Sequence, residues 1–236
     1  MSVTLGSQRQ GVPVDELHDE FWGGSSLRNI GFWGETEHDG GAASRRLVDE
    51  VWGLAGRAGG DVLMLERSDG AEAEHVGADR ARRVTVLAPG ASPAGLPAAA
   101  FDVALCSEVT DDLGHDADLW RTIHRSLRPD GCLVFSCPVA RPAAGAEPTD
   151  VVALARGGPL LQQLAAVGFV EPEIRDVTTS CWHGYYWRMT RYWHDRLWSC
   201  AVGPEAKIAA LDDVYRRADL QAGHVLVRLR AGGCDA

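Results

Sequence analysis

Short apolar segments alternate with segments of mixed polarity along most of this chain. An apolar run of roughly four to eight residues, bounded by turn residues, is typical of a strand buried on both faces of a parallel sheet. The segments that we predict to be strands are residues 61–66, 83–88, 101–106, 132–139, 171–178 and 224–231.

The segments between these strands carry apolar residues at helical spacing. In residues 41–57, for example, Leu47, Val48 and Val51 share one face, and Ser44 is a candidate N-cap. Alternation of strands and helices predicts an α/β fold, with a mostly parallel sheet flanked by helices. The segments that we predict to be helical are residues 41–57, 71–82, 116–127, 149–167 and most of 181–219.

Length and composition narrow the function classes. The chain has 236 residues, of which 45% are hydrophobic, which suits one α/β domain and is short for two. A net charge of -10 repels phosphate backbones, so we expect no nucleic-acid partner. No apolar run approaches the roughly 20 residues of a membrane helix, and residues 1–14 lack the apolar core of a signal peptide. We therefore expect a cytoplasmic protein with no membrane partner.

The six cysteines are scattered and form no CxxC pair, so we expect free thiols. Cys181, His183, His194 and Cys200 have the ligand types of a zinc site, but their spacing matches no common zinc-binding pattern. We therefore predict no metal.

The most specific stretch is residues 101–139, in which FDVALCSEV precedes HDADLWRTIHRSLRPDGCLVFSCPV. This order resembles the fourth strand, helix, turn and fifth strand of class I S-adenosylmethionine-dependent methyltransferases. In particular, it looks like the bacterial type that modifies natural products. Residues 127–131 are similar to the family's L-R-P-G-G turn, with Asp130 in place of one glycine. Residues 29–33 look like the family's lid, and residues 224–230 look like its last strand.

The resemblance implies a Rossmann-like methyltransferase fold in which residues 1–236 form a single domain. In this domain, residues 15–57 would form an N-terminal lid and helix, and residues 59–139 a degraded nucleotide-binding core. Residues 140–236 would form the C-terminal half, with a helical aromatic cap at residues 181–219.

The turn that binds the cofactor departs from the family pattern. The family has an acid at the end of the first strand, followed by glycines that let the backbone approach S-adenosylmethionine, and the next helix helps hold it. Here Met64 holds the acid position, Glu66 and Ser68 hold two glycine positions, and Gly70 remains. If cofactor contacts are retained, the resemblance places them at Gly70, Glu66, Cys106 and Ser107.

Two further departures lie between this turn and the strand at residue 101. The family has two helices and two strands there, which need about 40 residues, but only residues 71–100 are available. One β-α crossover is therefore predicted to be shortened or lost. The family also holds the cofactor's ribose and adenine with carboxylates, whereas no Asp or Glu occurs from Arg80 to Phe101. We favour a protein with no cofactor; binding of S-adenosylmethionine would require a rearranged site.

Ligands of α/β sheets bind at the carboxyl ends of parallel strands. This rule selects Glu108, and His115 is close to it in the sequence. A carboxylate or imidazole at this edge could act as a general base, and His183 in the aromatic segment is a further candidate. The alternative is that these side chains are caps or solvated groups. The predicted catalytic residues are Glu108, His115 and His183.

Residues 181–200, CWHGYYWRMTRYWHDRLWSC, carry aromatic side chains at helical spacing. Together with two Phe-Trp pairs of the lid, they could line a pocket for an apolar or polyketide-like small molecule. A stripe of this kind is also typical of core packing. The predicted substrate-binding residues are Phe21, Trp22, Phe32, Trp33, Trp182, Tyr185, Tyr186, Met189 and Trp193.

Three functions fit these observations. We favour a methyltransferase-fold enzyme repurposed for S-adenosylmethionine-independent cyclisation, rearrangement or elimination of a small natural-product intermediate. The second is a divergent S-adenosylmethionine-dependent small-molecule methyltransferase. The third is a non-catalytic methyltransferase-like partner protein that uses the Trp-rich segment as an interface. A homodimer stays open, and the sequence does not identify the substrate.

Overall fold

A computed structural model gives the fold. It describes residues 19–27, 29–56, 60–66, 70–78, 81, 83–88, 91–109, 116–142, 150–199 and 202–232. His115, Cys200 and Cys234, on which predictions were made, lie outside these residues.

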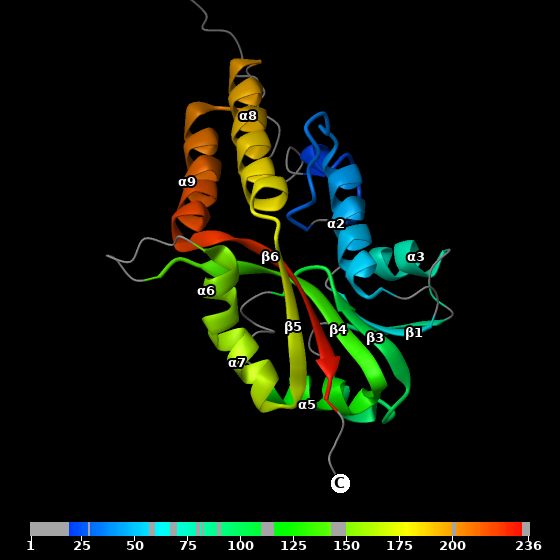
Figure 1. The fold of residues 1–236 in the computed structure, drawn as a ribbon. Coiled ribbons are helices and arrows are strands. Elements are labelled where there is room, and N and C mark those ends of the chain that lie inside the picture. The colour runs from blue at the N-terminus through cyan, green and yellow to red at the C-terminus, as the bar shows by residue number, and fades with distance from the viewer. Residues whose placement is uncertain are drawn as a thin grey trace, which may run out of the picture.

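The described strands form one mixed sheet in the order β2-β1-β3-β4-β6-β5 (Figure 1). Neighbouring strands pair in parallel from β2 through β1 and β3 to β4, whereas β6 is antiparallel to both β4 and β5. The prediction of a mostly parallel α/β sheet is confirmed. The strands are β1 (Asp61–Leu65), β2 (Arg83–Leu87), β3 (Phe101–Cys106), β4 (Leu127–Ala140), β5 (Phe169–Asp176) and β6 (Gln221–Ala231).

Helices cover both faces of the sheet (Figure 1). One layer contains α2 (Gly40–Leu54) and α3 (Ala71–Gly77), which pack on one apolar cluster. The other layer contains α5 (Ala117–Ser126), α6 (Val151–Gly157) and α7 (Pro159–Ala166), which pack on a second cluster.

Side chains of the central strands alternate between these two layers, as the pleat of a strand requires. On β4, Cys132 and Val134 face the α2 layer, whereas Leu133 and Phe135 face the α5–α7 layer. The strands are therefore apolar on both faces, which explains their continuous apolar sequences.

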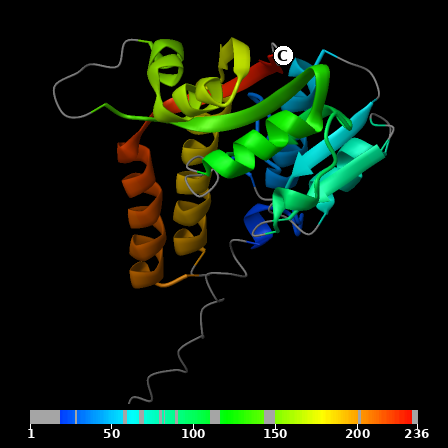
Figure 2. The ribbon, with the colours of Figure 1, turned by 90° about the horizontal axis from the view of Figure 1, so that it is seen from below.

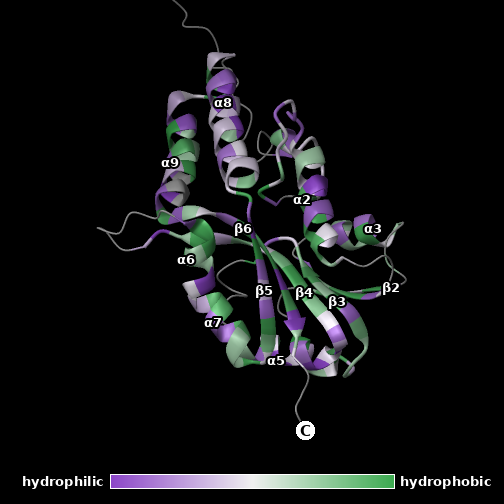
Figure 3. Cartoon of the chain, viewed as in Figure 1, coloured by the Kyte–Doolittle hydropathy of each residue, from purple (hydrophilic) through white to green (hydrophobic). Residues whose placement is uncertain are grey.

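The segment between β5 and β6 forms a helical hairpin. The short π-helical turn η2 (Thr179–His183) leads into α8 (Gly184–Trp198), which pairs with α9 (Pro204–Leu220). The two helices lie side by side and extend away from the sheet (Figure 2). Figure 3 shows mixed hydropathy on this hairpin and mainly hydrophobic residues on β3 and β4.

Two local predictions need correction. The helix expected at residues 149–167 is two helices, because Gly157 and Gly158 followed by Pro159 interrupt it. Ser44 is not an N-cap: Asp39 caps α2 by accepting a hydrogen bond from the Ala42 amide (3.1 Å), and Ser44 lies buried inside the helix.

The predicted loss of a crossover is confirmed for the described residues. Between Gly70 and β3 these contain α3, β2 and the 3-10 turn η1 (Pro93–Gly95). A single turn thus stands where the family has a second helix and strand.

The Leu-Arg-Pro-Asp-Gly segment bulges out of the start of β4, so that Phe101 pairs with Leu127 but Val103 pairs with Cys132. The bulge lets Arg128 reach back across the sheet, where it forms ion pairs with Asp61 (2.9 Å) and Asp102 (2.5 Å). This end of the sheet, opposite the carboxyl ends of β1 and β3, is held by charges and carries no candidate site.

In the part of the chain that the structure describes, no helix combines the length and the apolar character needed to cross a membrane.

Candidate functional site

A row of buried polar side chains crosses the sheet at its carboxyl edge. Glu66 follows β1, Ser107 follows β3, Ser136 lies near the end of β4, and His224 lies near the start of β6. By the alternation of side chains along each strand, all four side chains lie on the face of the sheet that packs against the α2 layer, and each residue is at most 4% exposed to solvent. Buried polar groups require partners, so their contacts define what this edge can do.

Glu66 caps the helix that follows it. Its carboxylate accepts hydrogen bonds from the backbone amides of Glu72 (2.8 Å) and Ala73 (3.1 Å). The first amides of a helix have no partner within the helix, and the positive end of the helix dipole attracts an anion. A side chain of the protein therefore supplies the anion at the start of α3.

Glu72 lies buried between Glu66 and Ser107. The Ser107 hydroxyl donates a hydrogen bond to Glu72 Oε1, and Asn29 Nδ2 donates a long one to the same oxygen (3.5 Å). Burial raises the pKa of Glu72 from 4.5 to about 7, and the charges of Glu66 and Glu108 act in the same direction. The two hydrogen bonds oppose this shift. Glu72 can therefore hold or release a proton near neutral pH.

Hydrogen bonds continue from this carboxyl across the sheet. Ser136 Oγ donates to the backbone carbonyl of Ser107, so it can only accept from the imidazole of His224, whose Nε2 lies 3.1 Å away. Burial lowers the pKa of His224 to about 3, so the ring is neutral with its proton on Nε2. In the described structure, Nδ1 of this ring has no hydrogen-bond partner.

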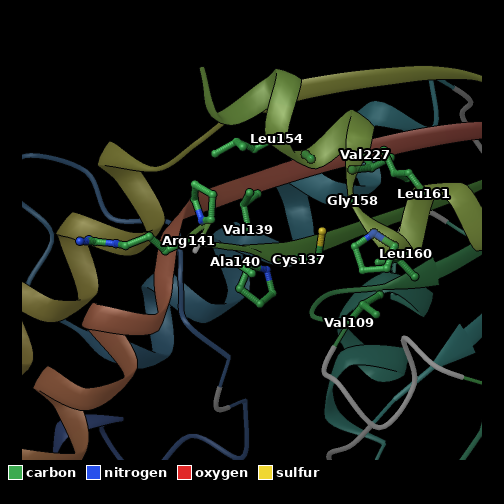
Figure 4. Close-up of a pocket in the computed structure, with 14 residues that line it drawn as sticks. Val109, Cys137, Val139, Ala140, Arg141, Leu154, Gly158, Leu160, Leu161 and Val227 are labelled. Atoms are coloured by element: carbon green, nitrogen blue, oxygen red, sulfur yellow. The ribbon is translucent and has the colours of Figure 1, made fainter. Parts of the chain in front are cut away.

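The other face of the same edge is apolar and hollow. A cavity of about 430 Å³ lies between the end of β4 and helices α6 and α7 (Figure 4). Cys137 of β4 and Val109, which follows β3, line it on one side, and Leu154, Leu160 and Leu161 line it from the helices. The edge therefore combines a polar network on one face with an apolar cavity on the other.

Comparisons with known proteins agree with this topology. Residues 50–135 match the family model described as a methyltransferase domain. The crystal structure of the [4+2]-cyclase SpnF superposes with a TM-score of 0.67 at 22% sequence identity and covers 93% of each chain. This is the class I methyltransferase fold.

Two further solved structures show the same methyltransferase fold. A cyclopropane synthase from Mycobacterium tuberculosis has a TM-score of 0.61 at 13% identity, covering 94% of this chain and 100% of its own. The geranyl diphosphate C-methyltransferase of Streptomyces coelicolor has a TM-score of 0.57 at 15% identity, covering 93% and 98%. Its crystal contains Mg²⁺, geranyl diphosphate and S-adenosyl-L-homocysteine. A search of curated protein sequences found no match.

The described residues do not fit the cofactor of the methyltransferase family. The amides of Glu72 and Ala73, at the helix start, already bind Glu66. Met64, at the position of the family's acid, is fully buried in the α2 layer, and the described residues of β2 and η1 include no carboxylate. Gly70 keeps one family feature, a left-handed φ of 91°, and no atom of the described residues lies within 4 Å of the position of an added Cβ.

The predicted catalytic residues do not all meet. Glu108 is half-buried next to Ser107, close enough for its charge to raise the pKa of Glu72. His183 is exposed on η2. Of the residues predicted as cofactor contacts, Glu66 and Ser107 belong to the polar row. Cys106 is buried on the other face, where its thiol donates to the Glu108 carbonyl (3.3 Å).

The predicted substrate-binding aromatics mostly pack on one another. Phe21 contacts Trp22, Trp33 and Tyr185, with ring centroids 5.0 to 6.2 Å apart. Trp182 and Tyr186 meet edge to face at 4.1 Å. Phe32 is half-buried beneath the guanidinium of Arg46. The set joins the lid to the hairpin; its fully buried members are Phe21, Trp22, Trp33, Trp182, Met189 and Trp193.

Sequence reasoning missed Glu72, Ser136 and His224. Glu72 appeared as an ordinary acid in the first turn of a helix, and Ser136 and His224 as isolated polar residues in strands. One signal in the sequence could have found Ser136 and His224. Both are polar residues within strands that are otherwise apolar, and both lie near the edge of the sheet where the parallel strands end. Glu72 lies on the helix that follows this edge.

The described residues contain no cluster of three or more His, Cys, Asp or Glu side chains that could hold a metal ion. Four of the cysteines, Cys106, Cys132, Cys137 and Cys181, are buried free thiols, as predicted.

Proposed function

We propose that this protein is a methyltransferase-fold enzyme that acts without S-adenosylmethionine and catalyses cyclisation, rearrangement or elimination of a small, apolar natural-product intermediate. The observation that carries the proposal is the carboxylate of Glu66 on the first amides of α3. This internal anion occupies two amides of the helix start that a ligand would otherwise use. The missing carboxylates of the β2 region support the same interpretation.

The chemistry that remains is proton transfer and hydrogen bonding at the carboxyl edge. Glu108 is half-buried and directly precedes Val109, which lines the apolar cavity, so its carboxylate is the candidate general base. Glu72 is buried on the opposite face of the sheet, where it holds or releases a proton inside the polar network. Cyclisations and eliminations of a preorganised substrate need little more than shape and one base. The superposition with a protein described as a [4+2]-cyclase is consistent with this class of reaction.

The alternative, a divergent methyltransferase, is favoured by one observation. Gly70 retains the left-handed backbone of the family's turn, and among the described residues no atom lies within 4 Å of the position that a side chain would occupy. A cofactor displaced toward Gly70 would then bind without using the amides that Glu66 covers.

Calorimetric titration separates the two functions. S-adenosylmethionine and S-adenosylhomocysteine should each give no binding heat with the purified wild-type protein at millimolar ligand. A matched titration of the Glu66→Gly variant, which restores a family glycine, tests whether the carboxylate is the obstacle. Micromolar binding of either ligand to the wild-type protein would reject the proposed function and make methyl transfer the leading hypothesis.

A further inference from the structure

We infer that the apolar cavity against α6 and α7, and not the aromatic cap, binds the body of an uncharged, apolar small-molecule ligand. In taking this ligand to be the substrate, the inference rests on the proposed function. The binding site itself is argued from the cavity.

The cavity has the size and position of a ligand site. Its volume of about 430 Å³ lies within the range of roughly 300–1,000 Å³ that is usual for small-molecule pockets. It adjoins the carboxyl ends of β3 and β4, where α/β sheets bind ligands, since Val109 follows β3 and Val139 lies near the end of β4. The cavity therefore lies at the edge of the sheet where α/β proteins bind their ligands.

The cavity lies beside an interruption between two short helices. The Gly157-Gly158-Pro159 sequence ends α6 and starts α7, and Gly158 lines the cavity. The leucines Leu154 of α6 and Leu160 and Leu161 of α7 lie on either side of this interruption and line the cavity.

The residues that line the cavity disfavour a charged ligand. Among the described lining residues, Arg141 is the single charged one, and its guanidinium points away from the cavity (Figure 4). The sulfur of Cys137 points from β4 into the cavity (Figure 4). Burial raises the pKa of this thiol to about 12, so it is neutral at physiological pH. A charged ligand group would be buried here without a partner, which is costly.

The aromatic cap offers less room. Trp193 and Met189 are each 1% exposed and pack against the lid side chains Trp22 and Trp33. Gly184, at the start of α8, lies so close to the Trp33 ring that an added Cβ would come within 3.0 Å of it. These residues hold the lid to the hairpin by filling the space between them.

The test uses a matched pair of dyes and two variants. The neutral fluorophore 1-aminoanthracene is titrated into the full-length protein and compared with anthracene-9-carboxylate, which has the same rings and a negative charge. Leu160→Trp narrows the cavity at a half-buried position, and Ile208→Trp places the same indole on the exposed face of α9. Thermal melting confirms that both variants fold.

We expect the neutral dye to bind at least about tenfold more tightly than the carboxylate, a difference typical of one unpaired buried charge. Leu160→Trp should weaken binding about tenfold or more, and Ile208→Trp should change it less than about twofold. Equal affinity for the two dyes, or equal effects of the two variants, would overturn the inference.

A second measurement applies if Leu160→Trp does not fold. Leu154→Phe then narrows the cavity at another half-buried lining position. It should weaken binding of the neutral dye about tenfold. An unchanged affinity in a folded Leu154→Phe variant would overturn the inference. Because neither assay involves S-adenosylmethionine, rejection of the proposed function would leave the result on this cavity readable.

Discussion

The two faces of the sheet have opposite chemistry at the same edge. Ser107 and Ser136 belong to a buried polar network, whereas Cys106 and Cys137, their sequence neighbours, belong to the apolar cluster of the other face. The period of two along a strand separates them completely. The comparison teaches that charge and empty space are kept apart here: the network is buried and polar, whereas the described walls of the cavity are mostly apolar and the guanidinium of Arg141 points away from it.

Because of this separation, substitutions on the two faces should change the free energy of unfolding in different ways. A carboxyl on the network face titrates near neutral pH because it is buried beside other carboxylates. Residues on the cavity face respond to volume and not to pH. Substitutions on one face should therefore show pH-dependent effects on stability, and substitutions on the other should not.

Replacing Glu72 with Gln should give the largest effect. Folding raises the pKa of Glu72 from 4.5 to about 7. The free energy of unfolding of the wild-type protein therefore decreases as the pH rises from 4.5 to about 7. The shift corresponds to about 3 kcal/mol. Glu72→Gln should therefore be more stable than wild type by about 3 kcal/mol at pH 8 and by less than about 1 kcal/mol at pH 5.

Urea unfolding at pH 5 and pH 8 measures this difference. Glu74→Gln is the control, because Glu74 lies on the same helix and is exposed. A Glu72→Gln effect that does not change with pH, or that matches the effect of Glu74→Gln, would contradict the assignment of a buried, titrating carboxyl.

Replacing Glu66 with Ala should break the network at its other end. The amides of Glu72 and Ala73 would lose their acceptor, which should cost about 2 kcal/mol at neutral pH. Loss of the Glu66 charge should also lower the pKa of Glu72, so stability should fall less steeply between pH 5 and pH 8. Urea unfolding of Glu66→Ala beside Glu74→Ala tests both effects; equal losses in the two variants would show that Glu66 is not the cap.

Much of the fold was predictable because the central strands are apolar on both faces. Residues 101–106 coincide with β3, and residues 61–66 and 83–88 differ from β1 and β2 by one residue. The sequence Gly157-Gly158-Pro159 indicates the interruption between α6 and α7, but the apolar residues on both sides keep helical spacing and predict one continuous helix. Periodicity averages over several turns, so it passes over a break of a few residues.

The candidate site was less predictable, because it depends on which side chains meet. Sequence correctly marked Glu66 and Ser107 as residues of the carboxyl edge, and Glu108 beside them. It could not show that the Glu66 carboxylate turns onto α3, since that depends on the loop geometry between β1 and the helix. The pKa of Glu72 depends on burial by the lid and on Ser107, which is 35 residues away.

The smallest expected effect gives the sharpest comparison of the two faces, because it uses adjacent residues. Ser107→Ala removes the hydroxyl that donates to Glu72, and Cys106→Ala removes a buried thiol of similar size from the other face. A hydrogen bond to an ionised carboxylate is stronger than one to its protonated form, so Ser107→Ala should cost about 1 kcal/mol at pH 5 and about 2 kcal/mol at pH 8. Cys106→Ala leaves a small void and should cost about 1 kcal/mol at both pH values. Urea unfolding of both variants at the two pH values measures the four free energies. If the cost of Ser107→Ala stays constant while that of Cys106→Ala changes with pH, the titrating carboxyl lies on the wrong face, and the division between a polar network and an apolar cavity fails.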